Sequence, residues 1–77
     1  MISELDTVVL LHDIEEHGLT GGDIGAVVHS YDDDGSVFEV EFVTAGGSTI
    51  ALLTLKEDEI RPMLAKEILH ARELVAA

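Results

Sequence analysis

The chain has 77 residues, of which 47% are hydrophobic, and sixteen acidic residues outnumber four basic ones to give a net charge of −12. A chain of this length forms one domain with a small core, which leaves no room for separate catalytic and substrate domains. Nucleic acids and anionic membranes are bound through positive charge, so this composition excludes both as partners. The absence of cysteine excludes disulfides, thiol catalysis and cysteine-ligated zinc.

The composition also bears on location. The sequence contains no apolar stretch near the roughly 20 residues that cross a bilayer as a helix. Its first residues lack the basic and long apolar regions of a signal peptide, so we expect none. Small secreted domains commonly depend on disulfides, and we therefore expect a cytoplasmic protein of bacterial type.

Three segments make up the first part of the chain. Asp6–Ile14 is rich in β-branched residues and leucine, which predicts a strand. Glu15–Gly22 is polar and punctuated by glycine, which predicts a loop. Asp23–Tyr31 again has strand composition, and Gly25 near its start predicts a bulge or a sharp bend.

The clearest strand signal follows the motif DDDGS. In Val37–Val43, apolar and acidic residues alternate, and this period of two predicts a half-buried strand. Its solvent face would carry Glu39 and Glu41. The preceding Asp34-Gly35 pair predicts a hairpin turn in which the glycine takes a positive φ.

The remaining β segments are short and closely spaced. Thr44–Ser48 predicts a second turn, and Thr49–Leu55 predicts a strand apolar enough to be buried on much of both faces. An acidic connection, Lys56–Glu59, then leads to a short strand at Ile60–Pro62. This order predicts a mainly β fold, a small SH3-like barrel of about five strands, because closing such a barrel reduces exposed strand edges.

The period changes after Pro62, which suits the first turn of a helix. Apolar residues then recur at spacings of four, three and four, and this recurrence predicts a C-terminal α-helix. The stripe consists of Leu64, Ile68, Ala71 and Val75. Leu69 points away from the stripe, so it is either exposed or part of a second contact face. The predicted organisation is a barrel over residues 1–62 and a helix over residues 63–77.

Four motifs also carry a family resemblance: DTVVLLHDI, GLTGGDIGAVV, FEVEFV and LLTLKEDEIRP. They lie within Asp6–Met63, and this part of the chain resembles a family of small bacterial proteins known as domain of unknown function 4926. The resemblance implies a compact SH3-like fold and supplies no activity, cofactor or catalytic residue. The segment after Met63 lies outside it.

The stretch from Ser30 to Glu41 has the spacing of a calcium loop at four of five key places. Serine occupies the first place, however, where a carboxylate normally binds the ion. The twelfth-place carboxylate also lies inside the alternating strand, so it would point off a sheet face. We therefore favour a hairpin turn over an EF-hand, and weak cation binding at the turn stays open.

A histidine pair suggests a second metal hypothesis. His12 and His17 are five residues apart, whereas the zinc protease motif places two histidines four apart on a helix. A loop site built from these histidines and a nearby carboxylate stays open. No phosphate-binding or nucleophile motif is complete, so we expect neither a cofactor nor enzymatic activity.

We therefore expect a small acidic, non-enzymatic protein-interaction module whose partner is a basic protein. One alternative is a structural or accessory subunit that dimerises, and so forms a homo-oligomer, through a helix at Pro62–Ala76. A second alternative is a weak metal-binding protein. The predicted partner-binding residues are Glu15, Glu16, Asp32, Asp33, Asp34, Glu39, Glu41 and Leu69.

Overall fold

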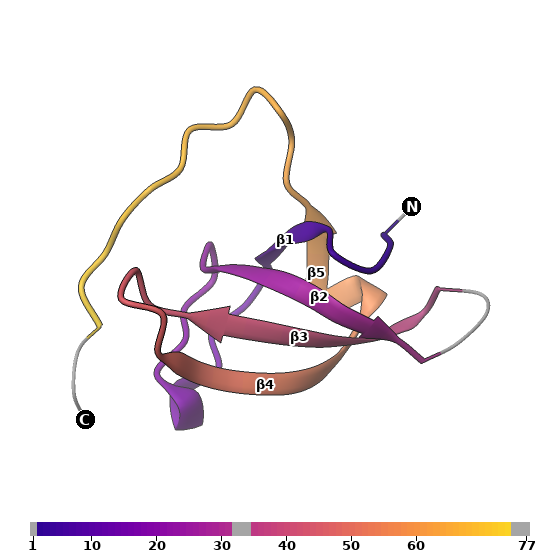
Figure 1. Ribbon diagram of the computed structural model, residues 1–77, viewed down its shortest axis with the longest axis horizontal. Helices are drawn as coiled ribbons and strands as arrows, with labels where there is room; N and C mark the ends of the chain where they lie inside the picture. The colour runs from indigo at the N-terminus through magenta and orange to yellow at the C-terminus, as the bar shows by residue number, and fades with distance from the viewer. Residues whose placement is uncertain (1, 32–34, 75–77) are drawn as a thin grey trace.

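A computed structural model describes residues 2–31 and 35–74 of the chain. Five strands form one antiparallel sheet in the order β4-β3-β2-β1-β5 (Figure 1). In chain order the elements are β1 (Thr7–Leu10), the 3₁₀ turn η1 (Glu15–His17), β2 (Ile24–Ser30), β3 (Val37–Val43), β4 (Thr49–Lys56), the 3₁₀ turn η2 (Glu57–Glu59) and β5 (Ile60–Pro62). Within the described ranges, no helix is long and apolar enough to cross a membrane.

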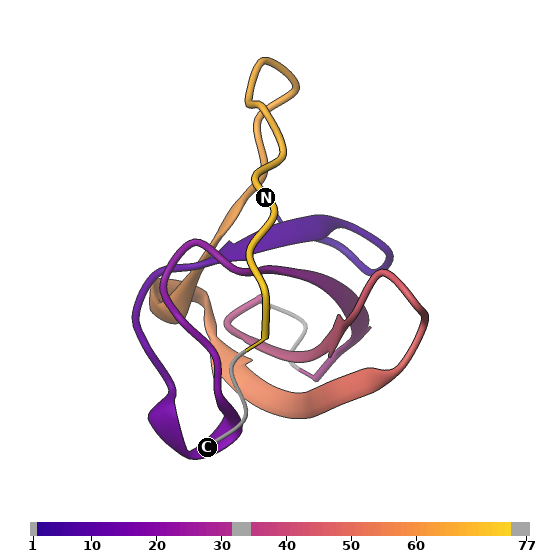
Figure 2. The ribbon, with the colours of Figure 1, turned by 90° about the vertical axis from the view of Figure 1, so that its left-hand side faces the viewer.

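The sheet is strongly curved (Figure 2). Its buried apolar side chains form one core cluster. All five strands contribute to this core, together with Leu19 from the loop after η1. The core consists of Val8, Leu10, Leu19, Val27, Phe38, Val40, Phe42, Ala51, Leu55 and Ile60. Burial of these apolar surfaces is the main force that holds so small a domain together.

β3 lies between β4 and β2 in the sheet, and its predicted bounds are confirmed. Its apolar residues alternate onto the buried face, with Phe38 and Phe42 almost completely enclosed. Glu39 and Glu41 occupy the opposite face, as the alternation predicts. Gly35, in the turn before β3, has the expected positive φ of 72°.

The prediction that the fourth strand is buried on much of both faces is wrong. β4 lies at one edge of the sheet and pairs only with β3 among the described strands. Its side chains alternate, so Ala51 and Leu55 are buried whereas Leu52 is 53% exposed. No described element covers the outer face of the sheet, so side chains of β4 that point outward stay exposed whatever the apolar composition of the strand.

The fold is mainly β, as predicted, but the predicted SH3-like barrel with a C-terminal α-helix is wrong. The sheet is open, because the described strands at its two edges, β4 and β5, do not pair with each other. Closing a barrel would require hydrogen bonds between these edges, and β5 contains only three residues. Its last residue is Pro62, which has no backbone N–H to donate.

No α-helix occurs among the described residues that follow β5. Leu64–Glu67 makes a single turn, and the chain then runs irregularly to residue 74. Ile68, a member of the predicted apolar stripe, is 92% exposed. A short helix needs tertiary contacts along its apolar face, and no described element covers this one. Val75 and Ala76 lie outside the described residues.

Gly25 has a packing role, and the bulge that was one of its two predicted roles does not occur at this residue. The register of β2 against β3 shifts between Val27 and His29, not at this glycine. A Cβ at position 25 would lie 2.7 Å from Val40 Cγ1 and 2.9 Å from Phe42 Cε1. The glycine therefore allows β2 to lie close against the buried side chains of β3.

Replacing Gly25 with alanine should destabilise the protein. The added methyl group must push core side chains of β3 apart, and we expect a loss of about 1–3 kcal/mol in the free energy of unfolding. Urea denaturation measures the change. Gly46→Ala is the matched control, because a Cβ there would meet only Thr44 Oγ1 at 3.9 Å. Equal stability of the two variants would contradict this role of Gly25.

Candidate functional site

The segment after β5, residues 63–74, forms what we call the C-terminal arch. It rises away from β5 and returns to the loop between β1 and β2 (Figure 1). Two arginine–carboxylate pairs fix its ends. Arg61 pairs with Glu67 near the start, and Arg72 pairs with Asp23 near the end.

The first pair holds the single turn that follows β5. Arg61 Nη1 and Nη2 donate to Glu67 Oε1 and Oε2 at 2.8 and 2.6 Å. The backbone N–H of Leu64 donates to Oε1 at 2.6 Å. The Arg61 guanidinium and this N–H lower the pKa of Glu67 to about 2. The turn is therefore stabilised by a charged acceptor at neutral pH.

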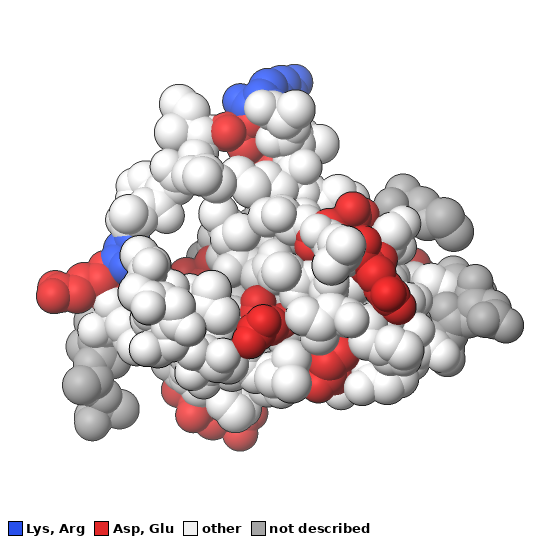
Figure 3. Space-filling model, viewed as in Figure 1, with Lys and Arg blue, Asp and Glu red and all other residues white. Residues whose placement is uncertain are grey.

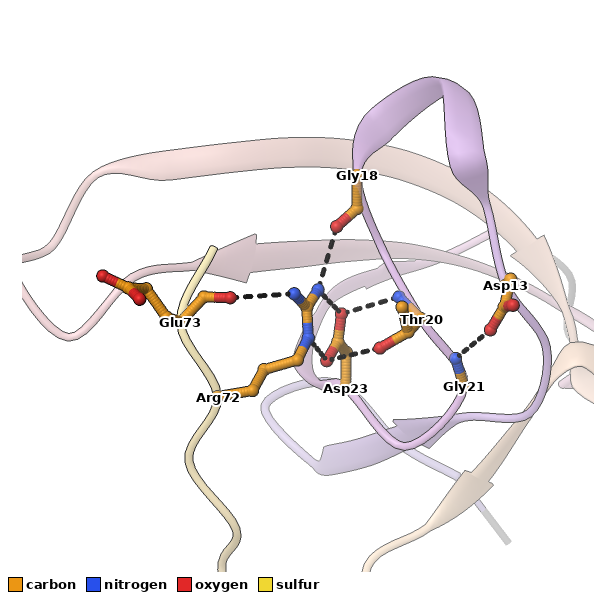
Figure 4. Close-up of polar contacts among 7 residues, drawn as sticks. All are labelled: Asp13, Gly18, Thr20, Gly21, Asp23, Arg72 and Glu73. Carbon is orange, nitrogen blue, oxygen red and sulfur yellow. Dashed lines mark hydrogen bonds and ion pairs between the residues drawn. The ribbon is translucent and has the colours of Figure 1, made fainter. Parts of the chain in front are cut away.

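The second pair forms the arginine seat, which we define as the Asp23 carboxylate and the Gly18 carbonyl. Arg72 Nε and Nη2 donate to Asp23 Oδ1 and Oδ2 at 2.7 and 2.6 Å (Figure 4). Nη2 also donates to the Gly18 carbonyl at 2.9 Å. The Arg72 hydrogen bonds are the largest cause that lowers the pKa of Asp23. Such forked pairing matches the planar guanidinium, which lysine cannot imitate.

Hydrogen bonds within the chain from β1 to β2 also orient the seat, independently of Arg72. The Thr20 N–H donates to Asp23 Oδ2 at 2.9 Å, and the Asp23 carbonyl accepts from Leu10 N at 2.8 Å. Gly21 N–H donates to Asp13 Oδ1 at 2.8 Å (Figure 4). Gly18 ends η1 in the left-handed region, at φ 71°. The acceptors are therefore held in place by a loop with its own hydrogen bonds.

A groove of about 330 Å³ lies beside the seat, between the arch and the sheet. Its floor is largely apolar and includes Leu19, Ile24, Phe42, Val43 and Ile50. His70, Ala71, Arg72 and Leu74 line it from the arch. An apolar groove beside a charged anchor point is the usual form of a site that binds a peptide or small ligand.

The predicted partner-binding residues fall in separate places. Glu15 and Glu16 are exposed on η1, and Glu39 and Glu41 lie on the outer face of β3. Leu69 is 69% exposed on the arch. The remaining predicted residues, Asp32, Asp33 and Asp34, lie outside the described residues.

The carboxylates on β3 make hydrogen bonds to its neighbour. Thr54 and Tyr31 hydroxyls donate to Glu39 Oε1 at 2.6 and 3.3 Å, and the Thr49 hydroxyl donates to Glu41 Oε2 at 2.9 Å. These hydroxyls hold two negative charges on one open sheet face. Glu41 therefore points off the sheet, as expected, and not around a calcium loop.

Sequence reasoning missed the arginine seat. Arg72 and Asp23 are 49 residues apart, and no local pattern connects them. The one local signal is the Thr20-to-Asp23 spacing, in which a carboxylate accepts from a backbone N–H three residues earlier. That signal predicts a turn and says nothing of an arginine partner.

The histidines that suggested a metal site do not form one in the described part of the chain. No three His, Asp or Glu side chains converge there in a way that could hold a metal ion. His12 Nδ1 lies 2.9 Å from the Asp13 carbonyl, and Nε2 lies 3.1 Å from Glu59 Oε1. Both ring nitrogens therefore face oxygen acceptors, which favours the doubly protonated ring. The Asp13 carbonyl and then the Glu59 carboxylate raise the pKa of His12.

Residues 4–62 match the family model described as Domain of unknown function (DUF4926). The chain belongs to the DUF4926 family. No curated protein and no solved structure matches it significantly. Asp23 and Gly18 lie inside the DUF4926 match, whereas Arg72 lies beyond it.

The His12 contact of this DUF4926 protein predicts a pH effect. A histidine pKa raised above 6.5 means that the contact contributes its full stability below pH 6.5. That contribution is lost as the pH rises through the pKa of the folded state. We expect NMR titration to place the His12 midpoint above 6.5 and Glu59→Gln to lower it. Glu57→Gln is the control, and equal midpoints in both variants would contradict the contact.

From the hydrogen bonds of Arg72 in the arginine seat, we predict that this residue holds the end of the arch. In Arg72→Ala, NMR order parameters of residues 70–74 should fall below about 0.6, the range of flexible backbone. Arg61→Ala removes the other pair and should leave these residues as ordered as in the unmodified chain. Unchanged order in Arg72→Ala would show that the groove contacts alone hold this end.

Proposed function

We propose that this DUF4926 protein is a non-enzymatic protein-interaction module that binds a basic protein partner. The observation that carries the proposal is the distribution of charge. Fourteen acidic and two basic residues precede Met63, so this part carries the whole net charge of −12. The two acidic and two basic residues of the C-terminal segment cancel.

Little of this negative charge is neutralised within the fold. Among the described residues, the ion pairs with arginine or lysine engage only Asp23 and Glu67. Figure 3 shows acidic side chains distributed over the viewed face, with basic ones only at the top and the left edge. An uncompensated field of this kind speeds the association of a basic partner and disfavours acidic ones.

The outer face of β3 and β4 supports a protein partner in particular. Glu41 lies opposite Leu52, and Glu39 lies opposite Thr54, in the register of the two strands. Leu52 is 53% exposed, and Val28 on β2 is 42% exposed. Protein interfaces combine an apolar centre with a polar rim, and this face offers apolar and charged side chains next to each other.

Capture from a lysate of the cells that encode the protein tests this proposal. The tagged full chain should recover one or more basic proteins, and their yield should fall as salt screens charges beyond a Debye length of about 8 Å. Glu39→Gln with Glu41→Gln should lower the yield about fivefold, because two lost ion pairs of about 0.5 kcal/mol each sum to about 1 kcal/mol.

The matched control is Glu57→Gln with Asp58→Asn, which removes the same charge from η2 and should preserve most of the capture. Three results would contradict the proposal: no captured protein, captured proteins without a basic bias, or the same yield with both double variants.

A further inference from the structure

We propose that the arginine seat and the adjoining groove bind an arginine-containing segment of a basic partner protein, with leucine two residues after the arginine. In the free protein, the chain's own Arg72–Leu74 occupies this site and must leave before the partner segment enters. The inference rests on the proposed function, because it names the kind of segment that the partner would present.

The seat selects arginine by its geometry. Asp23 accepts from two different nitrogens of one guanidinium, and the Gly18 carbonyl accepts a further hydrogen from one of them. Lysine presents a single nitrogen and cannot bridge both carboxylate oxygens in this way. Because Thr20 already orients the carboxylate, little rearrangement is needed when an arginine binds.

The groove supplies the second element of recognition. Leu74 Cδ1 lies 3.8 Å from the position that a Cβ on Gly18 would occupy. The left-handed glycine therefore gives the leucine side chain a close surface to pack on. Leu19 and Phe42 lie in the same groove, so an incoming leucine would bury apolar area there.

The arch is weakly attached and can be displaced. Within the described residues, no backbone hydrogen bond joins residues 68–74 to the sheet. Ile68 and Leu69, near the middle of the arch, are 92% and 69% exposed. Arg72 and the groove contacts thus hold the returning part of the arch, and segments with so few contacts open locally at low free-energy cost.

Charge favours a basic partner over a second copy of the chain. An exchanged arch would bring together two bodies that each carry the net charge of −12. Such bodies repel each other, whereas a basic protein is attracted to the same surface. The partner's arginine would therefore enter the seat that Arg72 occupies, and the rest of the acidic surface would also attract that partner.

The test uses a fluorescent peptide with the sequence of residues 68–74, ILHAREL, and measures its binding by anisotropy to the full-length chain. Arg72→Ala vacates the seat in the intact protein, so it should bind the peptide at least about tenfold more tightly than the unmodified chain, in which the tethered arginine competes. NMR shifts on binding should centre on residues 18–24. A peptide with citrulline in place of arginine should bind at least about tenfold more weakly, because it loses the charge-assisted pair.

Two further variants in the Arg72→Ala background provide matched controls. Adding Asp23→Asn should weaken peptide binding about as much as citrulline does, and adding Glu39→Gln should leave it within about twofold. The citrulline comparison needs no change in the protein, so it stays informative if Asp23→Asn fails to fold.

Several results would overturn the inference: no binding to Arg72→Ala at millimolar peptide, equal binding of the citrulline peptide, or shifts confined to the outer face of β3 and β4. An unmodified chain that sediments as a dimer and becomes a monomer in Arg72→Ala would instead identify a second copy as the occupant. Failure of the peptide while Glu39 and Glu41 still govern capture would leave the proposed function standing. Peptide binding without any basic captured partner would overturn the proposed function.

Discussion

The close packing of β2 against the buried face of β3 is the contact on which the other features depend. Gly25 allows it, because any side chain there would enter the space of Val40 and Phe42. With β3 held in this orientation, Glu39 and Glu41 must face outward. The same contact lies next to the loop that carries Asp23, directly before β2, so the core also positions the arginine seat.

The charges of the chain are divided between two parts with different roles. The part before Met63 carries the net charge of −12, and the later part is neutral. Arg72 uses one carboxylate of the acidic part as its anchor, with two nitrogens on two oxygens. In the interaction that we propose, Arg72 would compete with the arginine of a basic partner for this site.

The strands could be predicted because the patterns that indicate them depend on residues that are neighbours in the sequence. The alternation in Val37–Val43 identified both the bounds and the two faces of β3. The exposure of Leu52 was not predictable, since it depends on whether another part of the chain covers the outer face of the sheet. The helical spacing from Leu64 onward was misleading for a related reason. Periodicity describes an apolar face, but a short helix forms only where another surface covers that face.

The amino-acid sequence by itself determined the charge, the family, the β composition and the side of β3 on which the carboxylates lie. Only the tertiary structure decided that the sheet stays open, that the last segment is an arch, and that Arg72 meets Asp23. The reason is the distance along the chain over which each interaction acts. Side-chain alternation acts between adjacent residues, whereas strand order and an ion pair across 49 residues depend on how the whole chain closes on its core.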